Sequence, residues 1–185
     1  SAAVARARGA TLVEEPHRGY GAACLKGIEY LVAKRPDVIV FLDGDFSDHP
    51  EEMPRLLEPL RRGECDLVIG SRRLGRREPG ALLPQALFGN WLATRLIRLL
   101  YGARCTDLGP FRAIRFDRLQ ALGMRDRDFG WTAEMQVRAI RQGLRTVEVP
   151  VSYRRRVGVS KITGTLGGTL RAGGKILWMI FRNLA

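Results

Sequence analysis

The segment Val38-Ile39-Val40-Phe41-Leu42-Asp43-Gly44-Asp45-Phe46-Ser47-Asp48-His49-Pro50 decides the fold of this chain. Its apolar residues are rich in β-branched types, and a short apolar run that ends at Gly and Pro predicts a buried strand of a parallel sheet. Ligands of open α/β sheets bind beyond the carboxyl ends of such strands, which is where Asp43 and Asp45 stand. Gly44 lets the chain turn and bring both carboxylates to one cation. Hard oxygen ligands of this kind suit Mg²⁺ or Mn²⁺.

A simpler interpretation is that these acids only end the strand and begin the next helix. Asp48 precedes Pro50, and the acids Glu51 and Glu52 follow, which is typical of a capped helix start. An isolated Asp-x-Asp pattern is common by chance and would favour this interpretation. The buried strand before it favours a metal–diphosphate site instead, with Asp48 as either a third ligand or a helix cap.

Composition limits the class of protein and its partners. The 185 residues, 45% of them hydrophobic, can bury the core of one domain. The formal charge of +12 implies polyanionic partners, namely nucleic acid, an anionic membrane surface or phosphorylated substrates. Three widely spaced cysteines without a Cys-x-x-Cys pair indicate a reduced, cytoplasmic compartment. The apolar run at 176–181 is far shorter than the ~20 residues that a bilayer-spanning helix needs.

Hydrophobic spacing predicts helices that alternate with strands, which is typical of an α/β domain. We expect strands at 11–13, 38–42, 66–70 and 144–153, and helices at 21–34, from 48 to 62, at 84–101, around 117–122, from 130 onward and at 163–181. The predicted fold is a mostly parallel sheet flanked by helices. We divide the chain into a catalytic domain at 1–160 and an amphipathic helical segment at 161–185, which would either lie on an anionic membrane or pack against the domain.

Two features next to these elements are candidates for anion binding. Gly19 and Gly21 open a helix, where a close backbone approach to an anion is favoured, although an ordinary glycine turn explains them equally well. Arg72 follows the strand at 66–70 and would neutralise a phosphate. The other arginines of the loop at 72–80 are expected on the solvated rim.

The later part of the chain adds an acid and a second basic cluster. Glu134 stands in the first turn of a predicted helix, with Thr132 as the expected N-cap. Its carboxylate would either face the site or only complement the helix dipole. The loop at 153–161 carries the second basic cluster, which ends at Lys161.

Seven motifs occur in an order that resembles family 2 glycosyltransferases. They are Gly19-Tyr20-Gly21, Asp43-Gly44-Asp45, Gly70-Ser71-Arg72, Gly89-Asn90, Asp107-Leu108-Gly109-Pro110-Phe111-Arg112, Gly130-Trp131 with Glu134-Met135, and Arg156 with Gly158 and Ser160-Lys161. The resemblance covers nearly the whole chain and is nearest to dolichyl-phosphate mannose synthases and bacterial polyprenyl-phosphate glycosyltransferases. It implies a GT-A (Rossmann-like) fold, a nucleotide-sugar donor, a divalent metal, and inverting transfer to a polyprenyl or dolichyl phosphate.

The resemblance also implies roles for individual residues. Asp43 would lie near the ribose and the metal, and Asp45 would ligate the metal. Arg72 would meet the acceptor phosphate, and Arg156 and Lys161 would clamp phosphates of donor or acceptor. The complete expected set comprises the catalytic candidates Asp107, Trp131 and Glu134, the substrate-binding candidates Arg18, Gly19, Gly21, Arg72, Arg112, Arg156, Ser160 and Lys161, and the metal candidates Asp43, Asp45 and Asp48.

The chain departs from the family pattern at two places. Mannose synthases carry a Gln shortly after the second Asp as a further metal ligand, whereas Phe46-Ser47-Asp48 stands here. Family members also begin with two strands that grip the nucleotide base, and Ser1 follows both. We therefore expect a fragment that lacks roughly the first quarter of the catalytic domain. Such a fragment would have weak or no activity, and its exposed sheet edge would favour homo-oligomers.

The chemistry of the acceptor decides which groups the reaction needs. A lipid phosphate is already anionic, so positioning and stabilisation of the departing diphosphate would suffice. A hydroxyl acceptor would need a general base, for which Glu134 or Asp107 is the candidate. The two basic loops favour a phosphate, at a membrane on its cytoplasmic side.

A nucleic-acid-binding module is an alternative, but the arginines gather at strand ends and are not interleaved with stacking aromatics. A non-catalytic fragment is the other alternative.

Overall fold

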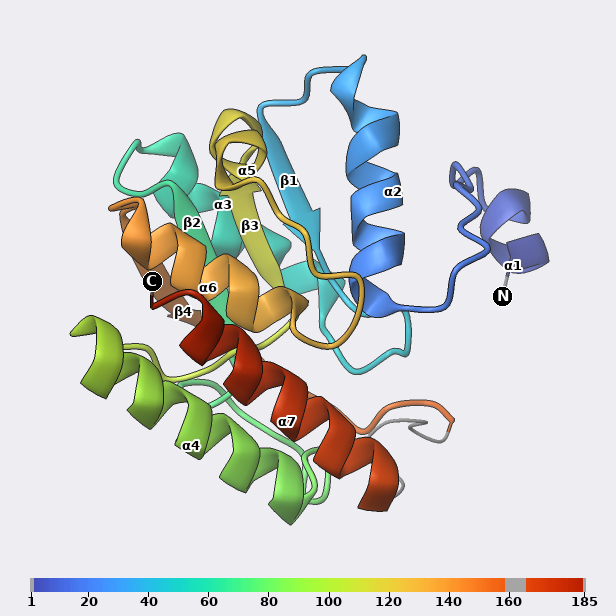
Figure 1. Ribbon diagram of the computed structural model, residues 1–185. Coiled ribbons are helices and arrows are strands. Elements are labelled where there is room, and N and C mark those ends of the chain that lie inside the picture. Colours follow the sequence, from blue (N-terminus) through green and yellow to red (C-terminus); the bar gives the residue numbers. More distant parts are fainter. Residues whose placement is uncertain (1, 159–165, 185) are drawn as a thin grey trace.

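The protein, seen here as a computed structural model, is described over residues 2–158 and 166–184. These residues form an α/β domain with helices on both faces of a sheet (Figure 1). The elements are α1 (Ala2–Ala7), α2 (Tyr20–Val32), β1 (Val38–Phe41), the 3₁₀ helix η1 (Pro50–Glu52), α3 (Met53–Arg61), β2 (Leu67–Ser71), α4 (Pro84–Tyr101), β3 (Arg112–Arg115), α5 (Phe116–Leu122), α6 (Trp131–Arg141), β4 (Thr146–Pro150) and α7 (Leu166–Arg182).

The sheet of the described chain has four strands in the order β1-β3-β2-β4. β2 and β4 pair in parallel, whereas β3 runs antiparallel between β1 and β2. β1, β2 and β4 therefore point the same way, as the sequence predicts, and β3 is the exception. Because β1 and β2 share a direction, their carboxyl ends deliver Asp43 and Arg72 to the same edge of the sheet.

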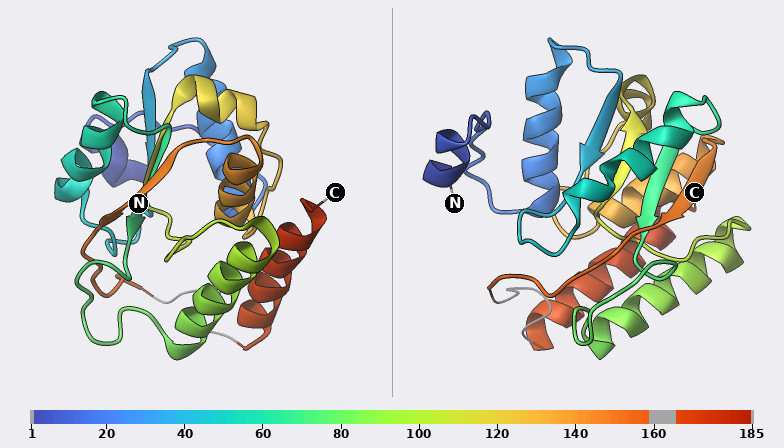
Figure 2. Two further views of the ribbon diagram at one scale, coloured as in Figure 1. Left: turned by 90° about the vertical axis from the view of Figure 1, so that its left-hand side faces the viewer. Right: turned by 180° about the vertical axis from the view of Figure 1, so that it is seen from behind.

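Alternating side chains of the strands cover both faces of the sheet. Ile39, Leu67, Ile69 and Ile114 pack under α2, α5 and α6 on one face. The residues between them in the strands pack against α3 on the other face, which Figure 2 shows from behind. Both faces are thus buried, which explains why β1 and β2 have near-continuous apolar sequences rather than alternating polar ones.

Helix α6 separates the sheet from the paired helices α4 and α7. Trp131 and Met135 of α6 face the sheet, and Ala133 and Val137 face α4 and α7. In all views α4 and α7 lie side by side on the outer side of the domain (Figures 1 and 2). Ile180 of α7 is completely buried in this contact. α7 therefore packs on the domain, which is one of the two placements that the sequence leaves open.

Several predicted elements need correction. Residues 11–13 form no strand, and 112–115 form the antiparallel strand β3, where no strand was predicted. Helix α6 begins at Trp131 after Gly130, so Thr132 is not its N-cap. The helical region after Asp48 begins as η1, and no side chain caps η1 or α3, so Asp48 is not a helix cap.

Candidate functional site

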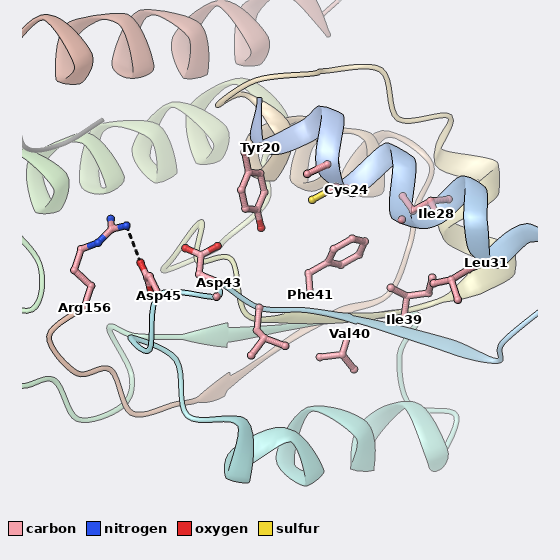
Figure 3. Close-up of a pocket in the computed structure, with 14 residues that line it drawn as sticks. Tyr20, Cys24, Ile28, Leu31, Ile39, Val40, Phe41, Asp43, Asp45 and Arg156 are labelled. Atoms are coloured by element: carbon pink, nitrogen blue, oxygen red, sulfur yellow. Dashed lines mark ion pairs between the residues drawn. The ribbon is translucent and has the colours of Figure 1, made fainter. Parts of the chain in front are cut away.

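A cavity of about 610 Å³ lies between α2 and β1, and its polar end is formed by residues that follow β1 (Figure 3). Side chains of Ile28 and Leu31 from α2 and of Ile39 from β1 line the apolar end. Asp43, Asp45 and Arg156 line the other end, where Tyr20 also lies. The predicted carboxylates therefore border the cavity at the expected edge of the sheet.

Asp43 is held in an environment that opposes its charge. Partial burial raises its pKa to about 6, and the neighbouring carboxylates of Asp48 and Asp45 act in the same direction. Arg72 and Arg156 oppose this shift by their positive charges, but they do not cancel it. Near neutral pH this carboxylate is mostly ionised yet destabilised, so an added cation would be favoured beside it.

Asp48 lies under the same turn and is almost completely buried, with 2% of its surface exposed. Its Oδ2 accepts a hydrogen bond of 2.9 Å from the backbone N–H of Asp43, while its Oδ1 has no hydrogen-bond partner. Burial raises the pKa of Asp48, against the lowering effect of the Asp43 amide. A buried carboxylate oxygen without a donor is costly, and a bound cation is one way to satisfy it.

Asp45 joins the turn to the second basic segment of the chain. Its Oδ1 accepts hydrogen bonds from the backbone N–H and the hydroxyl of Ser47. Its Oδ2 forms an ion pair of 3.1 Å with Arg156. The backbone N–H of Val157 donates to the carbonyl of Asp45 at 2.9 Å. The segment around Arg156 thus lies against the turn, and Arg156 stands at the mouth of the cavity.

The same turn is fixed from outside by Arg154. Phe46 has a φ of +73°, a left-handed backbone conformation that is uncommon for a residue with a large side chain. The guanidinium of Arg154 lies 3.4 Å from the centre of the Phe46 ring and donates to the carbonyl oxygens of Phe46 and Asp48. These contacts stabilise a strained turn whose carboxylates point inward, and strain of this kind concentrates at functional sites.

The donor set fits a divalent cation that shares its coordination with a ligand. Asp43, Asp45 and Asp48 are all carboxylates, the ligand type that Mg²⁺ and Mn²⁺ prefer. Over residues 2–158 and 166–184, however, no three His, Cys, Asp or Glu side chains converge to hold a metal by themselves. A cation at this turn would therefore complete its shell with oxygens of a bound phosphate or water.

Arg72 and Asp107 form a buried pair beside this turn. The Arg72 Nε and Nη2 atoms lie 2.7 Å from the two carboxylate oxygens of Asp107, and the backbone N–H of Arg72 donates to Oδ2 at 2.8 Å. Burial by itself would raise the pKa of Asp107, but the charge and hydrogen bonds of Arg72 outweigh it and lower that pKa. Arg72 and Asp107, both predicted as site residues, thus lie beside the turn, and they form an ion pair with each other.

Arg112 is completely buried rather than exposed to a ligand. Its guanidinium donates to the carbonyl oxygens of Gly109 and Thr132. Burial lowers the pKa of Arg112 to about 10. These contacts connect the loop after Asp107 to the start of α6. Arg112 therefore holds two parts of the protein together instead of facing a ligand.

Gly19 and Gly21 serve a contact within the protein. A Cβ atom at either position would lie about 2 Å from a carbonyl oxygen of the loop at 126–128, at 2.1 Å for Gly19 and 2.0 Å for Gly21. The first N–H groups of α2 donate to carbonyls of that loop, from Gly21 at 3.2 Å and from Ala22 at 2.9 Å. The close approach thus involves a loop rather than an anion. Arg18 is exposed just before this helix.

Glu134 and Trp131 lie in the interior near the start of α6. Glu134 accepts hydrogen bonds from the backbone N–H groups of Arg125 and Asp126, and lies 2.9 Å from Nε of Arg138. It borders a different cavity, of about 240 Å³, from the one beside Asp43. Trp131 is fully buried, with its ring packed edge-on to Phe41. Ser160 and Lys161 lie outside the described residues.

Several residues that shape the site were not among the predicted ones. Asn90 donates to the carbonyl of Thr106 and accepts from the N–H of Leu108, and Glu148 accepts from the N–H groups of Thr106 and Asp107. Together they hold the loop that carries Asp107. Asn90 belongs to the motif Gly89-Asn90, which was the available signal, whereas Glu148 lies in β4 without any local signal.

Comparison with known proteins identifies relatives over most of the chain. The family model described as glycosyl transferase family 2 matches residues 2–123. An undecaprenyl-phosphate mannosyltransferase from Micrococcus luteus is 35% identical over 81% of this chain and 63% of the relative. A polyprenol monophosphomannose synthase from Mycolicibacterium smegmatis is 32% identical over 80% of this chain and 57% of the relative. The aligned chain thus spans less than two thirds of the length of either relative.

Solved structures agree with the fold. A glucosyl-3-phosphoglycerate synthase from Mycobacterium tuberculosis, solved with Mn²⁺, UDP-glucose and phosphoglyceric acid, has a TM-score of 0.71 and covers 97% of this chain. The match covers 62% of that structure at 21% sequence identity. At this identity the likeness concerns the arrangement of helices and strands.

Proposed function

Because this chain belongs to glycosyltransferase family 2, we propose that it forms the metal- and diphosphate-binding part of an enzyme that moves a hexose from a nucleotide-sugar to a polyprenyl phosphate. The observation that carries the proposal is the turn after β1. There the carboxylates of Asp43 and Asp45 and the guanidinium of Arg156 line one end of a cavity large enough for part of a nucleotide-sugar. The names of the relatives support the acceptor class, and the UDP-glucose bound in the glucosyl-3-phosphoglycerate synthase structure supports the donor class.

In this proposal the chain's own residues position the donor diphosphate. Asp43 and Asp45 would hold Mn²⁺ or Mg²⁺ together with diphosphate oxygens, and Arg156 would place a positive charge beside them. A bound divalent cation supplies charge stabilisation to the departing diphosphate. The buried Asp48 orients the turn through the N–H of Asp43. With donor and acceptor held on opposite sides of the anomeric carbon, the transfer inverts its configuration.

A phosphate acceptor fits the surroundings of the two candidate bases. The pKa of Asp107 is lowered by its pair with Arg72, so this carboxylate is a poor general base. Glu134 is occupied by backbone N–H groups and lies at another cavity. An acceptor whose oxygen is already anionic needs neither residue as a base. Arg72 stays the proposed contact of the acceptor phosphate, with its guanidinium held in place by Asp107.

We also place the outer face of α4 and α7 against an anionic membrane. The described residues contain no helix long and apolar enough to cross a bilayer. On α4, the rings of Phe88 and Trp91 pack together and are about half exposed or more. On α7, Trp178 is 46% exposed, with Lys175 and Arg182 at 5.0 and 4.6 Å from its ring. Exposed aromatics beside basic side chains are typical of helices that lie in a membrane interface.

Calorimetric titration of the protein with UDP- and GDP-hexoses, with and without Mn²⁺, tests the donor site. We expect Mn²⁺-dependent binding that is lost in Asp45→Ala. Asp37→Ala is the matched control, because Asp37 is an exposed acid at the opposite end of the same strand. Binding that is equal in Asp45→Ala and the wild type would contradict the assignment of Asp45.

Co-sedimentation with vesicles tests the membrane face. We expect the protein to bind vesicles that contain about 30% phosphatidylglycerol, which have an anionic surface. It should not bind vesicles of pure phosphatidylcholine. A Trp91→Ser/Trp178→Ser double variant should bind more weakly, because both rings are exposed on this face. Equal binding by the double variant would assign the interaction to another surface.

A further inference from the structure

A second cavity, of about 240 Å³, lies between α7, the first turns of α6 and the loop at 125–128. We call it the α7 cavity; among the described residues it shares none of its lining with the cavity beside Asp43. Its volume is below the range of about 300–1,000 Å³ that is typical of pockets for drug-sized ligands, so it suits a small group. Five basic side chains line it, against three acidic ones, and the basic ones are Arg125, Arg127, Arg138, Lys175 and Arg182.

Two of the three acids are already paired within the wall of the α7 cavity. Glu134 accepts hydrogen bonds from two backbone N–H groups of the loop at 125–128, and its Oε1 lies 2.9 Å from Nε of Arg138. Asp126 also accepts from backbone N–H groups, and its Oδ2 lies 2.9 Å from Nζ of Lys175. The side chains of these two acids are only 2% and 1% exposed. They therefore fix two of the cations and leave little negative charge of their own toward the cavity.

The other three basic side chains of the lining have no carboxylate partner in the described part of the chain. Arg125, Arg127 and Arg182 are all exposed, and the third acid of the lining, Asp128, is exposed as well. A neighbouring cavity of about 350 Å³ shares lining residues with the α7 cavity and adds a further basic side chain, Arg141. The mouth of the α7 cavity therefore carries an excess of positive charge that no group of the described protein neutralises.

The chemistry of this lining matches a phosphate group. Guanidinium groups bind two phosphate oxygens at once, and an ammonium group adds a compact positive charge. Trp178 lies in the same wall and holds two of the cations, since Lys175 and Arg182 lie 5.0 and 4.6 Å from the centre of its ring. Cations that are held in place before the ligand arrives lose less conformational freedom when it binds.

We propose that the α7 cavity is a binding site for a phosphate group, separate from the diphosphate site beside Asp45. The headgroup of a phospholipid and a free phosphate ester both present this group. The lipid source rests on the proposed placement of α7 at an anionic membrane, because Trp178 would then bring the mouth of the cavity to the headgroups. The site itself depends neither on the donor nor on the metal.

Titration with glycerol 3-phosphate at fixed ionic strength tests the site. The variant Arg125→Gln/Arg182→Gln removes two exposed cations of the cavity. Arg95→Gln/Arg98→Gln is the matched control, because both residues are exposed on α4, in the proposed membrane face, and line neither of these two cavities. We expect the cavity variant to bind glycerol 3-phosphate about tenfold or more weakly than the control, the size of one hydrogen bond to a charged group.

Co-sedimentation of the same two variants with vesicles that contain about 30% phosphatidylglycerol distinguishes the sources of the phosphate. Vesicle binding that is about tenfold weaker in the cavity variant than in the control would support the site and assign it to a lipid headgroup. Equal vesicle binding, together with the loss of glycerol 3-phosphate binding, would support the site and assign it to a free phosphate ester.

Two results would overturn the inference. One is equal affinity of the cavity variant and the control for both probes, and the other is a wild-type protein that binds neither probe. Both measurements contain neither nucleotide-sugar nor metal. A chain that fails to bind the donor would therefore refute the proposed transfer function and leave the outcome for the α7 cavity unaffected.

Discussion

The buried pair of Arg72 and Asp107 leads to a quantitative prediction about stability. Asp107→Ala would leave the guanidinium without the carboxylate that accepts from Nε, Nη2 and the backbone N–H. The side chains of Arg72 and Asp107 are only 13% and 1% exposed, so water cannot replace the lost acceptor. Removing one member of such a pair costs about 3–5 kcal/mol. We expect a loss of this size in the free energy of unfolding, measured by urea denaturation.

Asp117→Ala is the control, because Asp117 is 68% exposed and lies 3.8–3.9 Å from its arginine partners. It should change stability little, since exposed ion pairs contribute little. Asp107→Asn keeps the shape and an acceptor oxygen, and should therefore fold even where Asp107→Ala does not. Equal free energies of unfolding for the Asp107→Asn, Asp117→Ala and wild-type proteins would refute the reasoning.

The pH dependence of the same pair has a definite sign. The folded pKa of Asp107 is lowered, so the stabilisation is present above the unfolded pKa of about 3.9 and is lost as the pH falls through the folded value. The wild type should therefore lose stability below about pH 4 more steeply than Asp107→Asn. Parallel acid-unfolding curves for the two proteins would contradict this.

Two further predictions concern the turn and helix α2. Mn²⁺ affinity should rise as the pH increases through about 6, because burial and neighbouring carboxylates raise the pKa of Asp43 to that value. Asp48→Asn removes one of these carboxylates and should move the midpoint to lower pH. A midpoint that does not move would refute the coupling. Gly21→Ala should unfold at a lower temperature than the wild type, because its Cβ would lie 2.0 Å from a carbonyl oxygen. Gly27→Ala, whose Cβ would meet no atom within 4 Å, should raise the free energy of unfolding by about 0.5–1 kcal/mol. Equal melting temperatures for the two variants would contradict this.

The parts of the fold that the sequence predicts are those with local signals. Helix α4 runs over the predicted residues 84–101, because its apolar spacing is regular over five turns. Strand β1 follows from a single apolar run. Strand β3 contains two arginines in four residues, and Arg112 is buried only because distant carbonyl groups accept from it. No local pattern reports such partners, which is why this strand was missed.

The residues of the candidate site also divide into those with a local signal in the sequence and those without one. Asp43, Asp45 and Arg156 could be placed together from the ends of strands and the order of motifs. The pairing of Arg72 with Asp107 joins residues 35 positions apart, and each was predicted for a separate role. Glu134 was expected at the site, yet local backbone N–H groups surround it in the interior. The placement of residues at strand ends was thus predictable, and contacts between loops were not.

The unpartnered oxygen of Asp48 has a consequence for the stability of this domain in solutions of different ion content. The native state contains a buried group that lacks a donor, and the unfolded chain would hydrate that group fully. A cation that binds only the folded turn would raise the unfolding free energy by about 1.4 kcal/mol for each tenfold excess over its dissociation constant. The melting temperature of the protein would then depend on the divalent-ion content of the buffer.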